Sequence, residues 1–201
     1  LQVRLQALGL EQPPQLLTHG IDPDRWKEPA PSKPKRGPEL VFWGLVDQRL
    51  DVAWVAALGQ WCEQKGGALR LIGPTQDPDP QLAALPGVSL VGAAKYEDLP
   101  GIAARSDVLV MPYADLPVTR AMQPLKFKEY LATRKPVVAR DLPSIKTWAD
   151  AADLVGTEQA LVEAVALRVK SGLPREHAQA RERLREESWE AKAEVLWGTL
   201  V

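Results

Sequence analysis

The sequence has few of the side chains that form covalent cross-links or zinc sites. Its 201 residues include one cysteine, Cys62, and two histidines, His19 and His177. A single cysteine cannot form an intramolecular disulfide, which fits a reducing compartment. One cysteine and two histidines are also a poor ligand set for zinc. We therefore expect structural roles for all three side chains and no metal site.

An excess of charge and long apolar runs are also missing. The 25 basic and 26 acidic residues give a formal net charge of −1. Nucleic-acid-binding proteins usually carry a basic field, so nucleic acid is not an expected partner, whereas a small phosphorylated ligand needs only one or two cations. The apolar runs are far shorter than the ~20 residues of a membrane-spanning helix, and no signal peptide is recognisable at the start. We expect no transmembrane segment and a cytoplasmic location, with association at the inner face of the membrane left open.

Composition divides the chain into four parts. Residues 1–28 are interpreted as the remnant of an interdomain hinge and N-terminal domain, and residues 29–38 as a proline-rich linker or loop. Residues 39–173 alternate short apolar runs with amphipathic stretches, and residues 174–201 form a helical tail rich in Glu, Arg and Ala. Because the sequence begins with leucine rather than methionine, we expect a piece of a longer chain.

The third part alternates predicted strands and helices. Strands are predicted at residues 40–43, 68–72, 88–91, 107–111 and 136–139, with a weaker one at 153–155. Helices are predicted at residues 51–64, 96–105, 124–133 and 158–170. Strands that are almost entirely apolar belong to parallel sheets covered on both faces, so the predicted fold class is α/β, a Rossmann-like three-layer parallel sheet. The binding site is expected beyond the carboxyl ends of the strands.

One segment has a distinctive order of residues. Residues 124–138 read Pro-Leu-Lys-Phe-Lys-Glu-Tyr-Leu-Ala-Thr-Arg-Lys-Pro-Val-Val. This segment resembles the signature of group 1 glycosyltransferases, in which a short helix is followed by a Lys-Pro-Val-Val entry into a strand. Other parts match in order and spacing: Thr18-His19-Gly20-Ile21-Asp22, Gly44 with Arg49, Leu71-Ile72-Gly73-Pro74, Val91-Gly92 with Tyr96, residues 107–113, and Ser188-Trp189. The resemblance implies the C-terminal, nucleotide-sugar-binding domain of a GT-B fold glycosyltransferase, which is one half of that fold.

The resemblance also implies a set of site residues. Arg49 and Lys126 are the expected catalytic cations, which would neutralise the charge that develops on the leaving diphosphate. Backbone amides at residues 120–123 would converge on the phosphates, and Glu129 would accept hydrogen bonds from the ribose hydroxyls. The expected nucleotide-sugar-binding residues are Gly44, Gly92, Ala93, Tyr96, Ala121, Met122, Gln123, Leu125 and Glu129. No metal and no other cofactor is expected.

One position departs from the family pattern. Retaining members often carry two glutamates eight positions apart, and the first commonly touches the donor sugar. Glu129 matches the second position, whereas the first is occupied by Ala121. The departure leaves the identity of the sugar open, together with activity itself.

Simpler structural roles compete with these assignments. Glu129 could be solvated or paired with Lys126 one turn earlier on the helix, and Lys128 could replace Lys126 from another face. Arg49 could cap the loop before residue 51. Tyr96 is interpreted as a core or capping aromatic rather than a contact of the base.

The expected function is that of a donor-binding domain. It would bind a nucleotide-diphospho-sugar for retaining transfer to a sugar, lipid-linked or protein acceptor, and it would be inactive without its N-terminal half. Two alternatives stay open at this point: a catalytically degenerate nucleotide-binding or interaction module, and half of a nucleotide-sugar epimerase.

Overall fold

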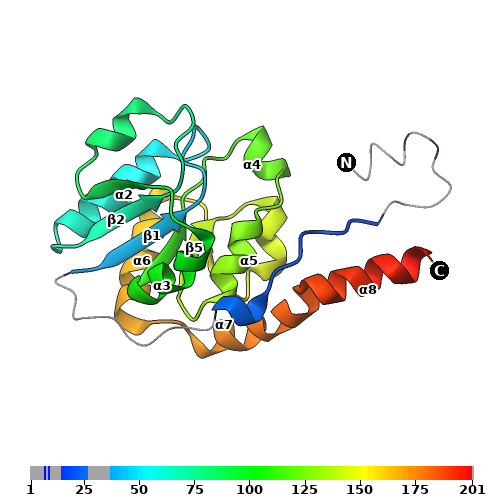
Figure 1. Ribbon diagram of the computed structural model, residues 1–201. Coiled ribbons are helices and arrows are strands. Elements are labelled where there is room, and N and C mark those ends of the chain that lie inside the picture. Colours follow the sequence, from blue (N-terminus) through cyan, green and yellow to red (C-terminus); the bar gives the residue numbers. More distant parts are fainter. Residues whose placement is uncertain (1–6, 8, 10–14, 27–36, 201) are drawn as a thin grey trace.

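The computed structural model describes residues 7, 9, 15–26 and 37–200 (Figure 1). Residues 29–36 of the linker predicted at residues 29–38, residues 27 and 28, and most of residues 1–14 lie outside this part of the chain. The strands are β1 (Glu39–Trp43), β2 (Ala68–Ile72), β3 (Val88–Gly92), β4 (Val108–Met111), β5 (Val137–Arg140) and β6 (Asp153–Val155). The α-helices are α2 (Val52–Glu63), α3 (Leu99–Arg105), α4 (Pro117–Ala121), α5 (Leu125–Ala132), α6 (Glu158–Ser171), α7 (Arg175–Ala180) and α8 (Trp189–Leu200).

The six strands form one parallel sheet in the order β3-β2-β1-β4-β5-β6. This order is that of a Rossmann-like fold, whose topological switch point lies between β1 and β4. Helices α2 and α6 pack against each other on one face, and α3 and α5 lie on the other (Figure 1). The predicted fold class is therefore confirmed.

The apolar strands form the centre of the core. All four residues of β4, and all of β1 except its first, are buried. The edge strand β3 differs, because Leu90 and Val91 are exposed. The connection before β3 contains only the short 3-10 helix η2 (Pro80–Ala84). The expectation that every strand is covered on both faces is thus wrong for β3.

Several short helices escaped prediction from the sequence. Helix α4 begins at Pro117, and its first turn is closed by Thr119, whose hydroxyl accepts from the Leu116 amide (2.9 Å) and donates to the Ala114 carbonyl (2.5 Å). The 3-10 helix η4 (Pro143–Trp148) follows β5. Both helices start at a proline, but each is too short to show a helical period in the sequence.

Arg181 joins the C-terminal helices to the sheet. It begins the 3-10 helix η5 (Arg181–Glu187) and is buried. Its guanidinium donates to the carbonyls of Ala151 (2.9 Å), Thr133 (3.2 Å) and Lys135 (2.8 Å). These carbonyls belong to the turns before β5 and β6, so a single side chain fixes both turns to η5.

The described N-terminal segment, residues 15–26, lies against the C-terminal helices. Ile21 donates from its amide to the Glu187 carbonyl (2.9 Å), and its own carbonyl accepts from the Trp189 amide (3.2 Å). The ammonium of Lys128 on α5 donates to the Thr18 hydroxyl (2.8 Å), the His19 carbonyl (2.7 Å) and the Glu187 carboxylate (2.5 Å). Beyond this junction α8 extends away from the sheet (Figure 1). Lys128 is therefore committed to this junction and does not replace Lys126.

Cys62 and His177 are buried side chains. Burial raises the pKa of the Cys62 thiol to about 12 and lowers the pKa of His177. A thiol with so high a pKa is a poor nucleophile, which agrees with a structural role. Among the helices of the described residues, none is long and apolar enough to cross a membrane.

Candidate functional site

Three glycines lie at the carboxyl ends of neighbouring strands: Gly44 follows β1, Gly73 follows β2, and Gly92 ends β3. The Gly44 amide donates to the Ile72 carbonyl (2.8 Å), and the Gly73 amide donates to the Gly92 carbonyl (2.8 Å). Gly44 has φ +144°, a conformation that favours glycine. A Cβ atom at Gly44 would collide with the side chain of Lys126. The missing side chain at position 44 thus makes the space in which this lysine lies.

Lys126 extends from the first turn of α5 to the ends of β1 and β4. Its ammonium donates to the Tyr113 hydroxyl (2.5 Å) and lies 4.9 Å from the ring centre of Phe42. Burial, with a smaller contribution from the positive charge of Arg49, lowers the pKa of Lys126 to about 8. An ammonium has three donors and the Tyr113 hydroxyl accepts one, so donors remain for an anion at the switch point of the sheet.

The guanidinium of Arg49 lies 5.8 Å from the ring centre of Tyr113. Its guanidinium binds Asp47 through Nε (2.9 and 3.0 Å) and Nη2 (2.7 Å), and its Nη1 lies 3.9 Å from the sulfur of Met122. Burial acts to raise the pKa of Asp47, but hydrogen bonds from Arg49 hold that pKa below its usual range. The alternative role of Arg49, capping the loop before residue 51, agrees with its bonds to Asp47 in that loop, while Asp51 caps α2 by accepting from the Trp54 amide (3.1 Å). Two cations and one carboxylate leave the cluster positive, as a diphosphate site requires.

Two of the backbone amides predicted for phosphate binding at residues 120–123 are already hydrogen-bonded. The amides of Arg120 and Met122 donate within the α4 turn, to the carbonyls of Leu116 (2.9 Å) and Val118 (3.0 Å). The prediction was wrong for these two amides because it took the segment before α5 to be a loop. The first amides of a helix have no intrahelical acceptor, so those of residues 125 and 126 at the start of α5 are the available donors.

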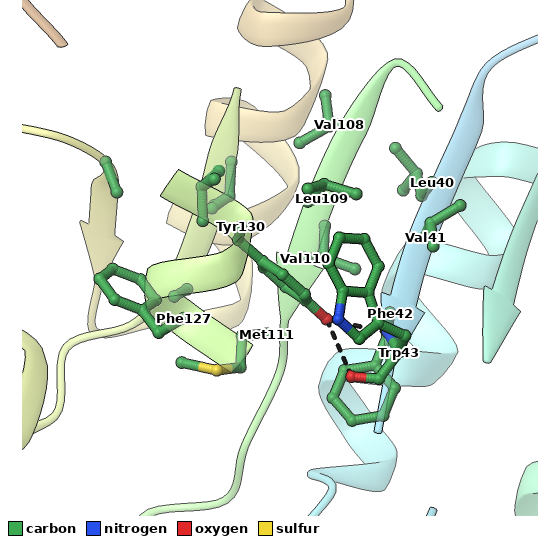
Figure 2. Close-up of a cluster of buried hydrophobic side chains, with 14 of the residues drawn as sticks. Leu40, Val41, Phe42, Trp43, Val108, Leu109, Val110, Met111, Phe127 and Tyr130 are labelled. Atoms are coloured by element: carbon green, nitrogen blue, oxygen red, sulfur yellow. Dashed lines mark hydrogen bonds between the residues drawn. The ribbon is translucent and has the colours of Figure 1, made fainter. Parts of the chain in front are cut away.

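Glu129 is buried, with 6% of its surface exposed, which excludes the alternative of a solvated glutamate. Its carboxylate accepts from the indole nitrogen of Trp43 at 3.1 Å rather than pairing with Lys126. The next residue, Tyr130, holds the backbone of the same tryptophan. Its hydroxyl accepts from the Trp43 amide (2.9 Å) and donates to the Trp43 carbonyl (3.2 Å; Figure 2). Consecutive residues of α5 therefore fix the end of β1.

Aromatic side chains continue from Trp43 to the molecular surface. Trp26, in the 3-10 helix η1 (Pro23–Trp26), stacks on Trp43 with ring centres 5.6 Å apart and planes 4° apart. Tyr96 packs edge-on against Trp26 at 5.8 Å, and Arg25 covers the Tyr96 ring at 4.4 Å. Burial and the negative charge of Glu129 raise the pKa of Tyr96 to about 12. Tyr96 is nevertheless 44% exposed, so it lies at the exposed edge of this aromatic cluster and not in the core.

The structure brings together some of the predicted residues. Gly44, Arg49, Lys126 and Met122 share one cluster around Tyr113, and Glu129 lies on the same helix as Lys126. Leu125 is half-buried at the start of α5, whereas Gly92, Ala93 and Ala121 are exposed. Gln123 lines a pocket with Thr18, Lys128 and Glu187, none of which belongs to the cluster around Tyr113.

Sequence reasoning missed four residues that complete the site, namely Trp26, Trp43, Asp47 and Tyr113. Two of them had a usable signal, because Trp43 ends β1 and Tyr113 follows β4 at the carboxyl edge of the sheet. No group of three or more His, Cys, Asp or Glu side chains that could hold a metal ion occurs within residues 15–26 and 37–200.

The charge of Lys126 predicts a pH dependence of anion binding. Since its pKa in the free protein is about 8, the protonated fraction falls about tenfold between about pH 7 and pH 9. A diphosphate held by this ammonium needs its charged form, so we expect the affinity for a nucleoside diphosphate to fall by about the same factor as pH rises through this range. Calorimetric titrations at several pH values measure this change in affinity. The variant Lys126→Met serves as the control, because any pH dependence that it keeps comes from groups other than Lys126, such as the ligand. An equal decline of affinity with pH in this variant would contradict the prediction.

A family model described as "Glycosyl transferases group 1" matches residues 37–171, which is more than half of the chain. The chain belongs to the group 1 glycosyltransferases. This group 1 domain is 41% identical over 64 residues to TuaH of Bacillus subtilis, a glycosyltransferase assigned to teichuronic acid biosynthesis, covering 32% of the chain and 16% of TuaH.

The domain also resembles solved GT-B glycosyltransferases. Anabaena HepE, solved with UDP, superposes with a TM-score of 0.73 at 15% identity, covering 98% of this chain and 59% of HepE. A variant of S. aureus TarM, solved with UDP among its ligands, gives a TM-score of 0.71 at 12% identity, covering 98% of this chain and 41% of TarM. The group 1 domain therefore spans about half of a GT-B enzyme or less.

Proposed function

We propose that this chain is the donor-binding domain of a retaining glycosyltransferase that uses a nucleotide-diphospho-sugar, with uridine as the base. The observation that carries the proposal is the cluster of Arg49 and Lys126 at the switch point of the sheet, one helix turn from Glu129. Two cations suit a diphosphate, and a buried carboxylate suits ribose hydroxyls. UDP in the HepE and TarM complexes supports uridine.

In this proposal each element of the site has a separate task. The diphosphate lies over the start of α5, where Lys126 and Arg49 stabilise the charge that leaves with it. The ribose lies at Glu129, and the base lies on the exposed backbone after β3, at Gly92 and Ala93. The acceptor, a sugar, a lipid-linked molecule or a protein, belongs to an N-terminal half, without which the domain does not turn over. The proposed location is the cytoplasm.

A second candidate is supported by Ala121. This residue stands where retaining members often carry a glutamate that touches the donor sugar, and it is exposed. A methyl group cannot accept a hydrogen bond from a sugar hydroxyl. A module that retains nucleotide binding and has lost transfer therefore remains the alternative.

Removal of the Glu129 carboxylate tests the proposal. Calorimetric titration of the chain with UDP, GDP and dTDP is expected to show binding of UDP. Glu129→Ala is expected to weaken that binding about tenfold to a hundredfold, the effect of losing charge-assisted hydrogen bonds. Glu163→Ala, at an exposed position on α6, is the matched control and should bind UDP as the wild type does.

The outcomes separate the candidates. Binding of UDP that depends on Glu129 supports a donor site, and product analysis with the N-terminal half present then distinguishes transfer from a degenerate module. A folded chain that binds none of the three nucleotides contradicts both.

A further inference from the structure

Glu129 and Trp43 come from distant parts of the sequence and meet in the core. Trp43 ends β1, and Glu129 lies in α5. A carboxylate that is only 6% exposed needs a donor to replace the water it has lost. The indole N–H of Trp43 supplies one, at 3.1 Å from Oε2 of Glu129. The Tyr96 hydroxyl is a second partner of this carboxylate, so the bond from the buried indole fixes one of its two oxygens.

The position of the indole is fixed by Tyr130 and Trp26. Tyr130 binds both the amide and the carbonyl of Trp43, which fixes the backbone from which the ring extends (Figure 2). The Tyr130 ring lies 4.2 Å from the Trp43 ring at a steep angle, and Trp26 stacks on the indole with nearly parallel planes. The direction of the N–H is therefore determined before any ligand arrives.

The bond engages only one of the two carboxylate oxygens. Oε2 is directed to the indole, and the Tyr96 hydroxyl also hydrogen-bonds to the carboxylate. A carboxylate has about four lone-pair sites, so acceptor capacity remains for a ligand. A carboxylate free to rotate would lose orientation entropy on binding a sugar, and a fixed one avoids that loss. The arrangement suits a ligand that presents vicinal hydroxyls, such as the ribose of the donor.

We propose that Trp43 is a positioning residue for Glu129, whose indole N–H holds one carboxylate oxygen so that the other is presented to the ribose hydroxyls. The inference rests on the proposed function, because it requires a ribose at Glu129. Trp43 acts through Glu129 and need not touch the nucleotide. It therefore governs the distinction between ribose and deoxyribose more than the binding of phosphate.

Comparison of UDP with 2′-deoxy-UDP tests this role. Trp43→Phe keeps a stacking ring and removes the N–H. The wild type is expected to prefer UDP by about tenfold, the effect of one charge-assisted hydrogen bond. In Trp43→Phe this preference should fall to about twofold or less, while 2′-deoxy-UDP binds nearly as in the wild type. The double variant Glu129→Gln with Trp43→Phe should show the same preference for UDP over 2′-deoxy-UDP as Glu129→Gln alone.

Other outcomes overturn the proposal. If Trp43→Phe weakens both nucleotides equally and keeps the preference, Trp43 is only structural. If the wild type binds UDP without any preference over 2′-deoxy-UDP, Glu129 does not read the 2′-hydroxyl and the inference fails while the donor site stands. If the folded wild type binds no UDP, the proposed function fails and this inference fails with it.

A second measurement does not depend on the stability of Trp43→Phe. The indole N–H resonance of Trp43, in the chain labelled with nitrogen-15, is expected to shift when Glu129 is replaced by glutamine and when UDP is added. Trp61, whose ring lies on α2 near Lys65, provides an internal control whose resonance should stay in place. An unmoved Trp43 resonance in both experiments would overturn the proposal.

Discussion

Replacing Gly44 with alanine is expected to weaken the binding of UDP about a hundredfold and to destabilise the fold by about 2 kcal/mol. Two effects combine in this variant. The backbone has φ +144°, and an L-residue held in such a conformation costs on the order of 1–3 kcal/mol. The new methyl group also takes the place of the Lys126 ammonium. A displaced lysine removes one of the two cations, and the loss of a charge-assisted bond accounts for most of the change in affinity.

Gly172 is the matched control for the backbone effect. It also has a positive φ, of +71°, and a Cβ atom there would meet nothing within 4 Å. Gly172→Ala should therefore lose stability but bind UDP as the wild type does. Thermal unfolding and calorimetric titration of both variants separate the two effects. Wild-type affinity in Gly44→Ala would contradict the placement of Lys126 at the diphosphate.

Arg181→Met is expected to lower the free energy of unfolding by about 3 kcal/mol, the largest change in stability predicted for this chain. Methionine keeps much of the apolar stem, so the effect isolates the guanidinium. Its loss leaves the carbonyls of Ala151, Thr133 and Lys135 without their donor, and an unsatisfied buried polar group costs about 1–3 kcal/mol. The change is well above that of an ordinary surface substitution.

Denaturant unfolding measures this change. Arg185 lies on the same 3-10 helix and is exposed, so Arg185→Ala should remain within about 0.5 kcal/mol of the wild type. A decrease of less than about 1 kcal/mol in Arg181→Met would show that water or neighbouring groups satisfy the three carbonyls. The turns before β5 and β6 would then be held by apolar packing alone.

The sequence predicted the sheet well because the signal for it is local. Buried parallel strands are short apolar runs, and each run between residues 39 and 155 became a strand. The exposure of β3 was not predictable, since it depends on what covers an edge strand and not on the residues of the strand. Helix α4 was missed because five residues are too few to show a period.

The site was predictable only in outline. Gly44 and Lys126 were found separately, through the family resemblance, but their contact depends on how α5 packs against the end of β1. The burial of Glu129 was missed for the same reason. Its partner Trp43 lies 86 residues earlier, and no local pattern links an indole to a carboxylate at that separation. Local chemistry therefore indicates which residues belong to the site, and tertiary packing decides what each of them does.

Lys128 connects helix α5 to two other segments of the chain. One ammonium fastens this helix to the segment that enters the domain, through Thr18 and His19, and to the segment that precedes α8, through Glu187. Both segments thus contact α5 at the same residue, two residues after Lys126 and one before Glu129. A displacement of either segment would therefore reach the helix that holds Lys126 and Glu129, the residues proposed to bind the diphosphate and the ribose.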